Sequence, residues 1–382
     1  MSKQTALILL IAIIISIIFF VGYSMRSTNK NEIEDIFNNE INEEEVVESE
    51  QVEPVDVPLT TVISENLSVP WGVAFLPEGD LLVTERPGRL VRIGENGAIY
   101  TIDGVEHVGE GGLLGVALHP EFSENRLVYL YLTTRAEGAL SNKIERYRLS
   151  NDELENREII FSGIPGARNH DGGRIAFGPD GKLYVTTGDA QNESSAQDTS
   201  VLSGKILRIN DDGTIPSDNP FGNAVWSYGH RNPQGLGWSD DGTLYSTEHG
   251  RSGILSGFDE INIIERGQNY GWPVIQGDET QAGMVSPLRH SGGNTTWAPA
   301  SAAYLNGSLY FGGLMGRSLY EAVVSGNEVV EMRVHFNREF GRIRTVGVGP
   351  DGMLYITTSN TDGRGSPFEG DDKIIRVNPD KL

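Results

Sequence analysis

The amino-acid sequence predicts an all-β protein whose main domain is a six-bladed β-propeller. Three observations support this fold class. From residue 59 to the end, one phrase returns six times: a short apolar run, a turn with Gly or Asn, and a second β-rich run. No stretch of about ten or more residues in this range shows a helical period. The 382-residue chain also contains 47 glycines and no cysteine, which suits many tight turns and excludes disulfides.

Each copy of the phrase marks one candidate blade. The turn residues of successive copies lie 45 to 65 residues apart, about the length of a four-stranded blade. A single blade cannot bury both faces of its sheet, whereas six blades packed radially can, and the closed ring leaves no long open edge. A β-sandwich would not repeat one phrase six times. In chain order the copies are VAFLPEGDLLVTE, VALHPEFSENRLVYLYL, IAFGPDGKLYVTTGD, LGWSDDGTLYSTEHG, AAYLNGSLYFGGL and VGVGPDGMLYITTSN.

An apolar segment precedes the repeats. Residues 5–22, TALILLIAIIISIIFFVG, can span a bilayer core of about 30 Å with a few flanking residues. No small-residue cleavage site follows them, so we expect residues 1–26 to be an uncleaved single-pass anchor, with a cleaved signal segment as the alternative. The propeller would then lie on the extracytoplasmic side of the cell membrane, or be secreted. A lipoprotein is excluded because there is no cysteine to acylate.

An acidic stretch, residues 27–58, separates this segment from the repeats. It has one aromatic residue, Phe37, and no sustained period, so we interpret it as a flexible linker that holds the domain of residues 59–382 off the membrane. The formal net charge of the chain is −23, and much of the acid lies in this linker. We do not expect nucleic-acid binding, which requires basic patches.

The connections between the predicted strands carry unusually specific strings. Loops on a rigid scaffold are where binding and catalytic residues concentrate. One string, RNHDGGR at residues 168–174, places His170 among polar residues and two glycines just before an apolar strand. The others are GEGGLLGVALHP at 109–120, GHRNPQGLGW at 229–238, STEHG at 246–250, DEINIIERGQNYGWP at 259–273, NTTWAPASA at 294–302 and GRIRTVGVGPDG at 341–352.

These strings, in this order, resemble the glucose/sorbosone dehydrogenase family, which includes the soluble quinoprotein glucose dehydrogenases and the aldose sugar dehydrogenases. The resemblance runs from about residue 59 to the end of the chain. It implies a six-bladed propeller, in agreement with the repeat count. It also implies a quinoprotein oxidoreductase that oxidises the anomeric hydroxyl of aldose sugars to lactones. The implied cofactor is pyrroloquinoline quinone (PQQ) seated on calcium, and electrons pass to an external acceptor.

His170 matches the family's catalytic base. Removing a proton from a sugar hydroxyl requires a base, and histidine suits this role because its ordinary pKa is about 6.5. The base needs an orienting partner, for which Asp189 in the string VTTGDA is the candidate. Arg231 matches a position that borders the quinone, where a guanidinium can stabilise negative charge as the quinone accepts hydride.

Arginine pairs suit a tricarboxylate cofactor, because guanidinium groups bind carboxylates through two hydrogen bonds. Arg342 and Arg344 lie two apart, on one face of a predicted strand, and match the family's cofactor arginines. Asn232 and Thr296 match further cofactor contacts. Glu110 stands where a glutamine contacts the quinone region in glucose dehydrogenase. A carboxylate there, unless protonated or paired, would repel an anionic cofactor.

Calcium takes oxygen ligands, including backbone carbonyls. The resemblance places the carbonyl ligands of the catalytic calcium at Gly250 and Arg251. It places the ligands of a second, structural calcium at the carboxylate of Glu260 and the carbonyl of Tyr270.

Besides Glu110, two positions depart from the family pattern, and two histidines need separate assignment. Met315 lies where the best-known members carry a lysine against the cofactor, with Arg317 nearby as a substitute. Asn169 replaces an acid beside the base. These departures, together with the glutamate described above, bear on cofactor affinity and substrate choice. His249, next to the calcium loop, is a candidate contact to cofactor or metal, whereas we assign His230 a packing role.

Two other functions remain open. A non-enzymatic extracellular propeller that binds a ligand or partner would predict erosion of the set formed by His170, Arg342 and Arg344, and this set is intact. A calcium-dependent lactonase on six blades would need carboxylate and asparagine side chains converging on one calcium. No such set can be assigned in the sequence, so the dehydrogenase is favoured.

Overall fold

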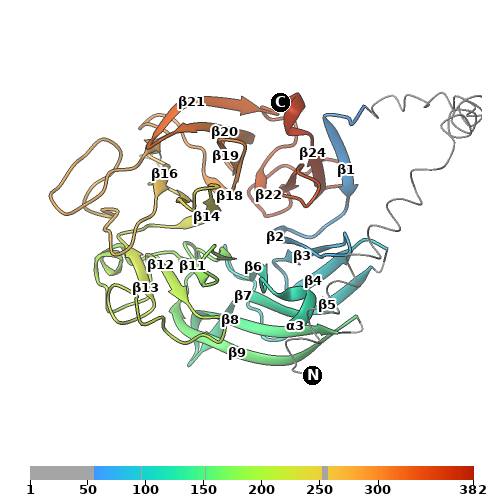
Figure 1. Ribbon diagram of the computed structural model, residues 1–382, viewed down its shortest axis with the longest axis horizontal. Coiled ribbons are helices and arrows are strands. Elements are labelled where there is room, and N and C mark those ends of the chain that lie inside the picture. The colour runs from blue at the N-terminus through green and yellow to red at the C-terminus, as the bar shows by residue number, and fades with distance from the viewer. Residues whose placement is uncertain (1–55, 96, 151, 252–256) are drawn as a thin grey trace, which may run out of the picture. The chain divides into compact units, whose positions relative to one another are not determined.

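The structure is a computed structural model that describes residues 56–95, 97–150, 152–251 and 257–382. Residues 57–382 form one compact unit. In the described part of this unit the strands pair into six antiparallel sheets of four strands each, arranged like blades around a central axis (Figure 1). The predicted six-bladed β-propeller is therefore confirmed.

Five blades are built from four consecutive strands. The first two comprise β2 (Pro70–Phe75), β3 (Leu81–Glu85), β4 (Arg89–Ile93) and β5 (Ala98–Thr101), then β6 (Leu113–Leu118), β7 (Leu127–Ala136), β8 (Ala139–Ser150) and β9 (Glu153–Pro165). The third comprises β10 (Ile175–Phe177), β11 (Leu183–Thr187), β12 (Lys205–Ile209) and β13 (Val225–Tyr228). The fourth and fifth comprise β14 (Pro233–Trp238), β15 (Leu244–Glu248), β16 (Glu260–Ile263) and β17 (Arg289–His290), then β18 (Pro299–Leu305), β19 (Ser308–Gly313), β20 (Ser318–Ser325) and β21 (Glu328–His335).

The sixth blade joins the two ends of the domain. It consists of β22 (Ile343–Val348), β23 (Leu354–Thr358) and β24 (Ile374–Val377), completed by β1 (Thr60–Ser64). β1 pairs antiparallel with β24, with Thr60 opposite Val377. The first strand of the domain thus closes the ring and covers an edge that β24 would otherwise leave open.

Each copy of the repeated phrase forms the first two strands of a blade and the turn between them. In the third copy, β10 and β11 are joined by a turn in which Gly181 has a φ of +71°, a left-handed conformation that glycine adopts without steric cost. The second copy differs, because its connection contains one helical turn, α3 (Phe122–Asn125), and the left-handed residue is Arg126 at φ +59°. Among the described residues, a short 3-10 helix, η1 (Glu193–Gln197), lies in the β11–β12 connection, and another, η3 (Pro379–Lys381), follows β24.

Apolar side chains on facing sheets form the core between blades. All five residues of β11 are buried, as expected for a strand covered on both faces. One cluster joins the second and third blades through Leu114, Tyr131 and Val185, and it also includes Trp71 from the first blade. Burial of such surface stabilises the fold by about 25 cal/mol per Å² of apolar area.

The strand connections alternate between the two ends of each sheet, because neighbouring strands are antiparallel. The connection that leads into a blade's first strand lies at the same end as the connection between its second and third strands. The predicted catalytic and PQQ-binding residues all fall in connections of these two kinds, or at the start of the strand that follows. The fold therefore gathers them at one end of the central axis.

In the portion of the chain that the structure describes, no helix is both long and apolar enough to cross a bilayer. The anchor predicted at residues 1–26 and all but residues 56–58 of the predicted linker lie outside the described ranges.

Candidate active site

His170 and Asp189 meet at this end of the axis. The His170 ring is 17% exposed, and its Nδ1 lies 2.8 Å from Oδ1 of Asp189, which is fully buried. The second oxygen of Asp189 accepts a hydrogen bond of 2.9 Å from Nε1 of Trp272. A carboxylate can only accept, so Nδ1 carries the proton and Nε2 is the basic nitrogen.

The backbone at His170 is strained and firmly held. Its φ of +65° is left-handed, which costs a non-glycine residue about 1–3 kcal/mol. The His170 N–H donates to Oε2 of Glu110 at 2.9 Å, and its carbonyl accepts from the N–H of Ala190 at 3.2 Å. Gly188 packs so closely that a Cβ there would lie 2.0 Å from the His170 carbonyl oxygen, so only glycine fits. These contacts fix the position of the imidazole.

Three arginines of the site, Arg342, Arg344 and Arg174, are buried. Nη2 and Nε of Arg342 bind Oδ2 of Asp362 at 2.8 and 3.0 Å. Arg344 donates through Nη1 to the side-chain oxygen of Gln234 at 3.2 Å. Arg174, the last residue of the string RNHDGGR, donates through Nε to the Gln234 carbonyl at 3.0 Å.

Burial leaves part of this positive charge uncompensated. The guanidiniums of Arg174 and Arg344 lie over the ring of Trp71, with 4.1 and 5.8 Å to the ring centroid, which is a favourable cation–π arrangement. Desolvation, followed by the charge of neighbouring arginines, lowers the pKa of each to about 9. An anion bound nearby would relieve this cost.

Several buried nitrogen atoms around the axis lack a hydrogen-bond partner within the described residues. They are Nη2 of Arg174, Nδ2 of Asn232, Nε2 of His249 and Nε of Arg86. Desolvation lowers the pKa of His249 to about 4, so this ring is neutral at physiological pH. Unpaired buried donors are costly, and a ligand rich in acceptor oxygens would satisfy them. The donor set therefore fits an anionic, acceptor-rich group such as a tricarboxylate quinone.

The enclosed part of the site is small. A cavity of about 10 Å³ is lined by Trp71, Glu110, Asp171, Gly172, Gln234, His249, Leu314, Arg344 and Arg364. This volume holds about one water molecule, so a larger ligand would have to rest across the mouth.

The predicted calcium loop is organised by Asp259. Its Oδ1 accepts from the N–H of Gly250 at 2.8 Å, and its Oδ2 accepts from the Thr296 hydroxyl at 2.8 Å and from the N–H of Ala298 at 2.9 Å. Arg251 forms an isolated bridge with Gly257, and residues 252–256 lie outside the described ranges.

No group of three or more His, Asp or Glu side chains in the described ranges could hold a metal ion. A cation at the Gly250–Arg251 loop would therefore rely on backbone carbonyls and on oxygens of a bound ligand. Asp259 lies in the DEIN string, but its role was not foreseen because nothing in that string shows which loops it would join.

The second predicted calcium pair lies beside a buried network. Desolvation, reinforced by the negative charge of Glu248, raises the pKa of Glu260. The Glu248 carboxylate lies 2.8 Å from Nδ1 of His230, within hydrogen-bond distance. It also accepts a hydrogen bond from the N–H of Arg231. His230 bonds the Ser227 hydroxyl at 2.8 Å and stacks on the Tyr270 ring at 4.8 Å. His230 is fully buried, so it packs and supports the loop of Arg231.

Two departures noted in the sequence have different structural outcomes. The side chain of Met315 is 57% exposed and its N–H bonds the Trp297 carbonyl at 3.2 Å. Glu110 is not an unpaired carboxylate, because Oε1 accepts from Nη1 of Arg364 at 2.6 Å. Arg364 was missed in the sequence because it belongs to none of the recognised strings.

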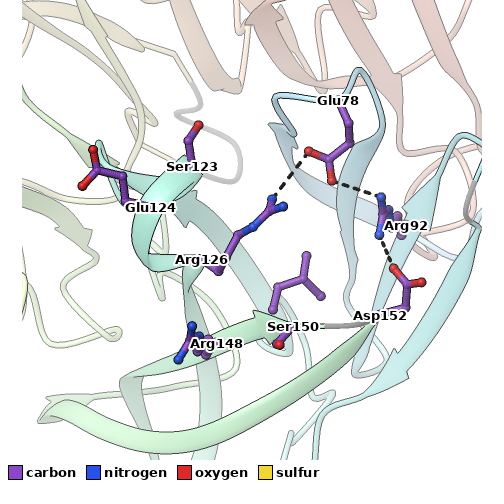
Figure 2. Close-up of a pocket in the computed structure, with 9 residues that line it drawn as sticks. Glu78, Arg92, Ser123, Glu124, Arg126, Arg148, Ser150 and Asp152 are labelled. Atoms are coloured by element: carbon purple, nitrogen blue, oxygen red, sulfur yellow. Dashed lines mark hydrogen bonds and ion pairs between the residues drawn. The ribbon is translucent and has the colours of Figure 1, made fainter.

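A larger pocket of about 480 Å³ lies at the other end of the sheets, among the β2–β3, β6–β7 and β8–β9 connections (Figure 2). Its charges largely compensate one another: Arg92 binds Asp152 at 2.5 Å and Glu78 at 3.1 Å, and Arg126 lies 3.7 Å from Glu78. None of the predicted site residues lines it.

Comparison with known proteins gives consistent results. Residues 67–366 match the Glucose / Sorbosone dehydrogenase family. The chain is 33% identical to the aldose sugar dehydrogenase YliI of Escherichia coli K12, over 83% of this chain and 92% of that protein. It is 34% identical to quinoprotein glucose dehydrogenase B of Acinetobacter calcoaceticus, over 59% of this chain and 54% of that protein. The PQQ-bound aldose sugar dehydrogenase of Streptomyces coelicolor superposes with a TM-score of 0.77 at 38% identity, covering 84% of this chain and 99% of that one.

Proposed function

The chain belongs to the glucose/sorbosone dehydrogenase family, and we propose that it is a PQQ-dependent dehydrogenase that oxidises the anomeric hydroxyl of aldose sugars to lactones. The single observation that carries this proposal is the hydrogen bond between His170 and Asp189, set beside a buried cluster of arginines. It combines a base with a site for an anionic cofactor. The names of the relatives support the substrate class and the cofactor.

Each residue has a role that follows from its contacts. Nε2 of His170 removes the proton of the anomeric hydroxyl, and Asp189 holds the ring in the required tautomer and stabilises the imidazolium that forms. Bound pyrroloquinoline quinone supplies the acceptor for the hydride that leaves the same carbon. The sugar thereby loses one proton and one hydride and becomes the lactone. Arg231, whose guanidinium lies 5.3 Å from the Trp272 ring centroid, would stabilise the negative charge that develops as the hydride is accepted.

The cofactor would be held by the cationic and polar groups around the axis. Arg342 and Arg344 would bind its carboxylates, and Asn232 and Thr296 would supply further polar contacts. Calcium would be bound at Gly250 and Arg251, and Glu260 with Tyr270 would hold a second, structural ion. An external acceptor would reoxidise the enzyme, and the predicted anchor would keep this chemistry at the outer face of the membrane.

Dye reduction by the full chain tests the proposal. The detergent-solubilised protein is supplied with calcium and PQQ and offered a panel of aldoses with an artificial electron acceptor. We expect PQQ-dependent turnover that falls by a factor of about 10² or more in His170→Ala, because general-base catalysis typically contributes this much. The His335→Gln variant is the control for loss of a partly buried imidazole, because His335 lies on the edge strand β21 of the fifth blade and contacts Glu321 there. The base His170 is unchanged in this control.

Three results would contradict the proposal. Tight PQQ binding with no turnover on any aldose would indicate a different substrate. Hydrolysis of a lactone that requires calcium but no PQQ would favour the lactonase. Absence of both PQQ binding and turnover would favour a ligand-binding propeller.

A further inference from the structure

Arg364 reaches across the site from a distant part of the chain. It lies in the β23–β24 connection of the sixth blade, and its side chain is 55% exposed. Nη1 bonds Oε1 of Glu110 at 2.6 Å, and Nη2 bonds the side-chain oxygen of Asn169 at 2.9 Å. Glu110 precedes the second blade and Asn169 precedes the third. One guanidinium thus joins three separate connections.

Both partners of Arg364 adjoin the base. Asn169 is the residue before His170, and the second oxygen of Glu110 accepts the His170 N–H at 2.9 Å. Since the backbone of His170 is left-handed, it needs such contacts to stay in place. Arg364 therefore acts on the turn that carries the base without touching the base itself.

The connection that carries Arg364 is itself firmly held. The N–H of Arg364 donates to Oδ1 of Asp362 at 2.9 Å, and the other oxygen of Asp362 binds Arg342. A Cβ at Gly365 would lie 2.5 Å from the Asn360 carbonyl oxygen, so this segment packs tightly against its neighbours. The guanidinium of Arg364 therefore extends from a backbone segment whose position is fixed.

The ion pair between Arg364 and Glu110 also affects the charge of Glu110. Desolvation alone would raise the pKa of Glu110, but the hydrogen bond from the His170 N–H and the pairing with Arg364 help to lower it to about 2. Glu110 is therefore ionised at physiological pH and lines the same cavity as Arg344. Without Arg364, this carboxylate would face any anionic ligand uncompensated.

We propose that Arg364 is a positioning residue, which holds the turn of His170 through Glu110 and Asn169 and neutralises Glu110 at the mouth of the site. This inference rests on the proposed function for its effect on catalysis. Arg364 is not assigned to the cofactor as a ligand. Arg364 is expected to act through its interaction with Glu110. The energetic coupling between two side chains is measured by a double-mutant cycle.

The cycle uses Arg364→Met, Glu110→Gln and the double variant of the full chain. Arg148→Met is the matched control, because Arg148 is exposed and lies at the other end of the sheets. PQQ binding to the protein freed of cofactor is followed by quenching of tryptophan fluorescence, which needs no turnover. We expect Arg364→Met to weaken PQQ binding about tenfold and the double variant to bind within about threefold of Glu110→Gln.

Kinetics separate positioning from general destabilisation. We expect Arg364→Met to lower kcat about tenfold while KM for the sugar changes by less than about threefold, because the base is misplaced but sugar contacts remain. Arg364→Lys should recover part of kcat, since it keeps the charge and loses one of the two contacts.

The proposal is overturned if the effects of Arg364→Met and Glu110→Gln on the free energy of PQQ binding are additive. If Arg364→Met weakens PQQ binding equally in the wild-type and Glu110→Gln backgrounds, Arg364 contacts the cofactor directly. If Arg364→Met behaves like Arg148→Met, it has no role. If the wild type binds no PQQ, the proposed function fails, and the pair is still tested by melting temperatures. There we expect the Arg364→Met and Glu110→Gln shifts to be non-additive by about 2–4 °C.

Discussion

At the scale of the residue, Asp171, the neighbour of His170, is a buried acid whose ionisation lowers the stability of the protein. Its side chain is 2% exposed; Oδ1 accepts from the Asn142 amide and the Ala167 N–H, both at 3.1 Å, while Oδ2 has no hydrogen-bond partner within the described residues. Desolvation raises its pKa to about 6 despite these two bonds. A buried acid that prefers to be neutral lowers stability once it must ionise.

We therefore predict that Asp171→Asn stabilises the protein above pH 6. The unfolded carboxyl ionises near pH 3.8 and the folded one near 6, so the wild type loses stability between these values and keeps the deficit above them. The amide reproduces the protonated acid and does not titrate. Melting temperatures of the two proteins should diverge from pH 4 to pH 6 and stay apart at pH 8. A constant difference from pH 4 to pH 8 would contradict this explanation.

At the scale of the element, one aspartate at the head of β16 organises two loops. Asp259 is 2% exposed and accepts hydrogen bonds from Gly250 on one side and from Thr296 and Ala298 on the other. The strand β16, which begins at the next residue, is only four residues long. The proposed calcium loop and the proposed cofactor contact therefore share a single anchor.

We predict that Asp259→Asn destabilises the protein by about 1–3 kcal/mol, because its amide nitrogen would face N–H donors where an oxygen now accepts. Hydrogen exchange should increase at Gly250 and at residues 296–298 together. Asp241→Asn is the control, since Asp241 accepts comparable bonds in the exposed β14–β15 turn. Faster exchange in one loop alone would show that Asp259 does not couple them.

At the scale of the whole molecule, the ring is held closed by the pairing of its two ends. β1 is the outer strand of the sixth blade and pairs with β24 along Thr60–Ser64. In the closed ring, Arg364 of the sixth blade contacts Glu110 and Asn169, which precede the second and third blades. The blade that β1 completes therefore contributes a residue to the mouth of the site.

Removing β1 should open the ring. We predict that a chain beginning at Val57 unfolds cooperatively, whereas one beginning at Glu65 loses cooperativity and self-associates, because β24 then offers an unpaired edge. Thermal unfolding and size-exclusion chromatography compare the two. Equal melting temperatures would show that the blades hold together without this strand.

Local patterns account for what could be predicted of the fold. The turn at Gly181 and the run LYVTT that follows it are both written in neighbouring residues, so the blade and its repeat are visible in the chain. The arginine pair at 342 and 344 is likewise a short spacing on one strand. The helical turn α3 was missed because its four residues are too few to show a period.

The contacts of the site were harder to predict, because many of them join residues that are far apart in the chain. The sequence by itself determined the number of blades, the candidate base and the string in which its aspartate partner lies, because each is carried by a local motif. Only the tertiary structure decided that Arg364 neutralises Glu110, 254 positions away, and that Trp272 supports Asp189 across 83 positions. Such pairs are formed by the curvature and closure of the ring, which no short pattern records, since each partner is locally compatible with many other neighbours.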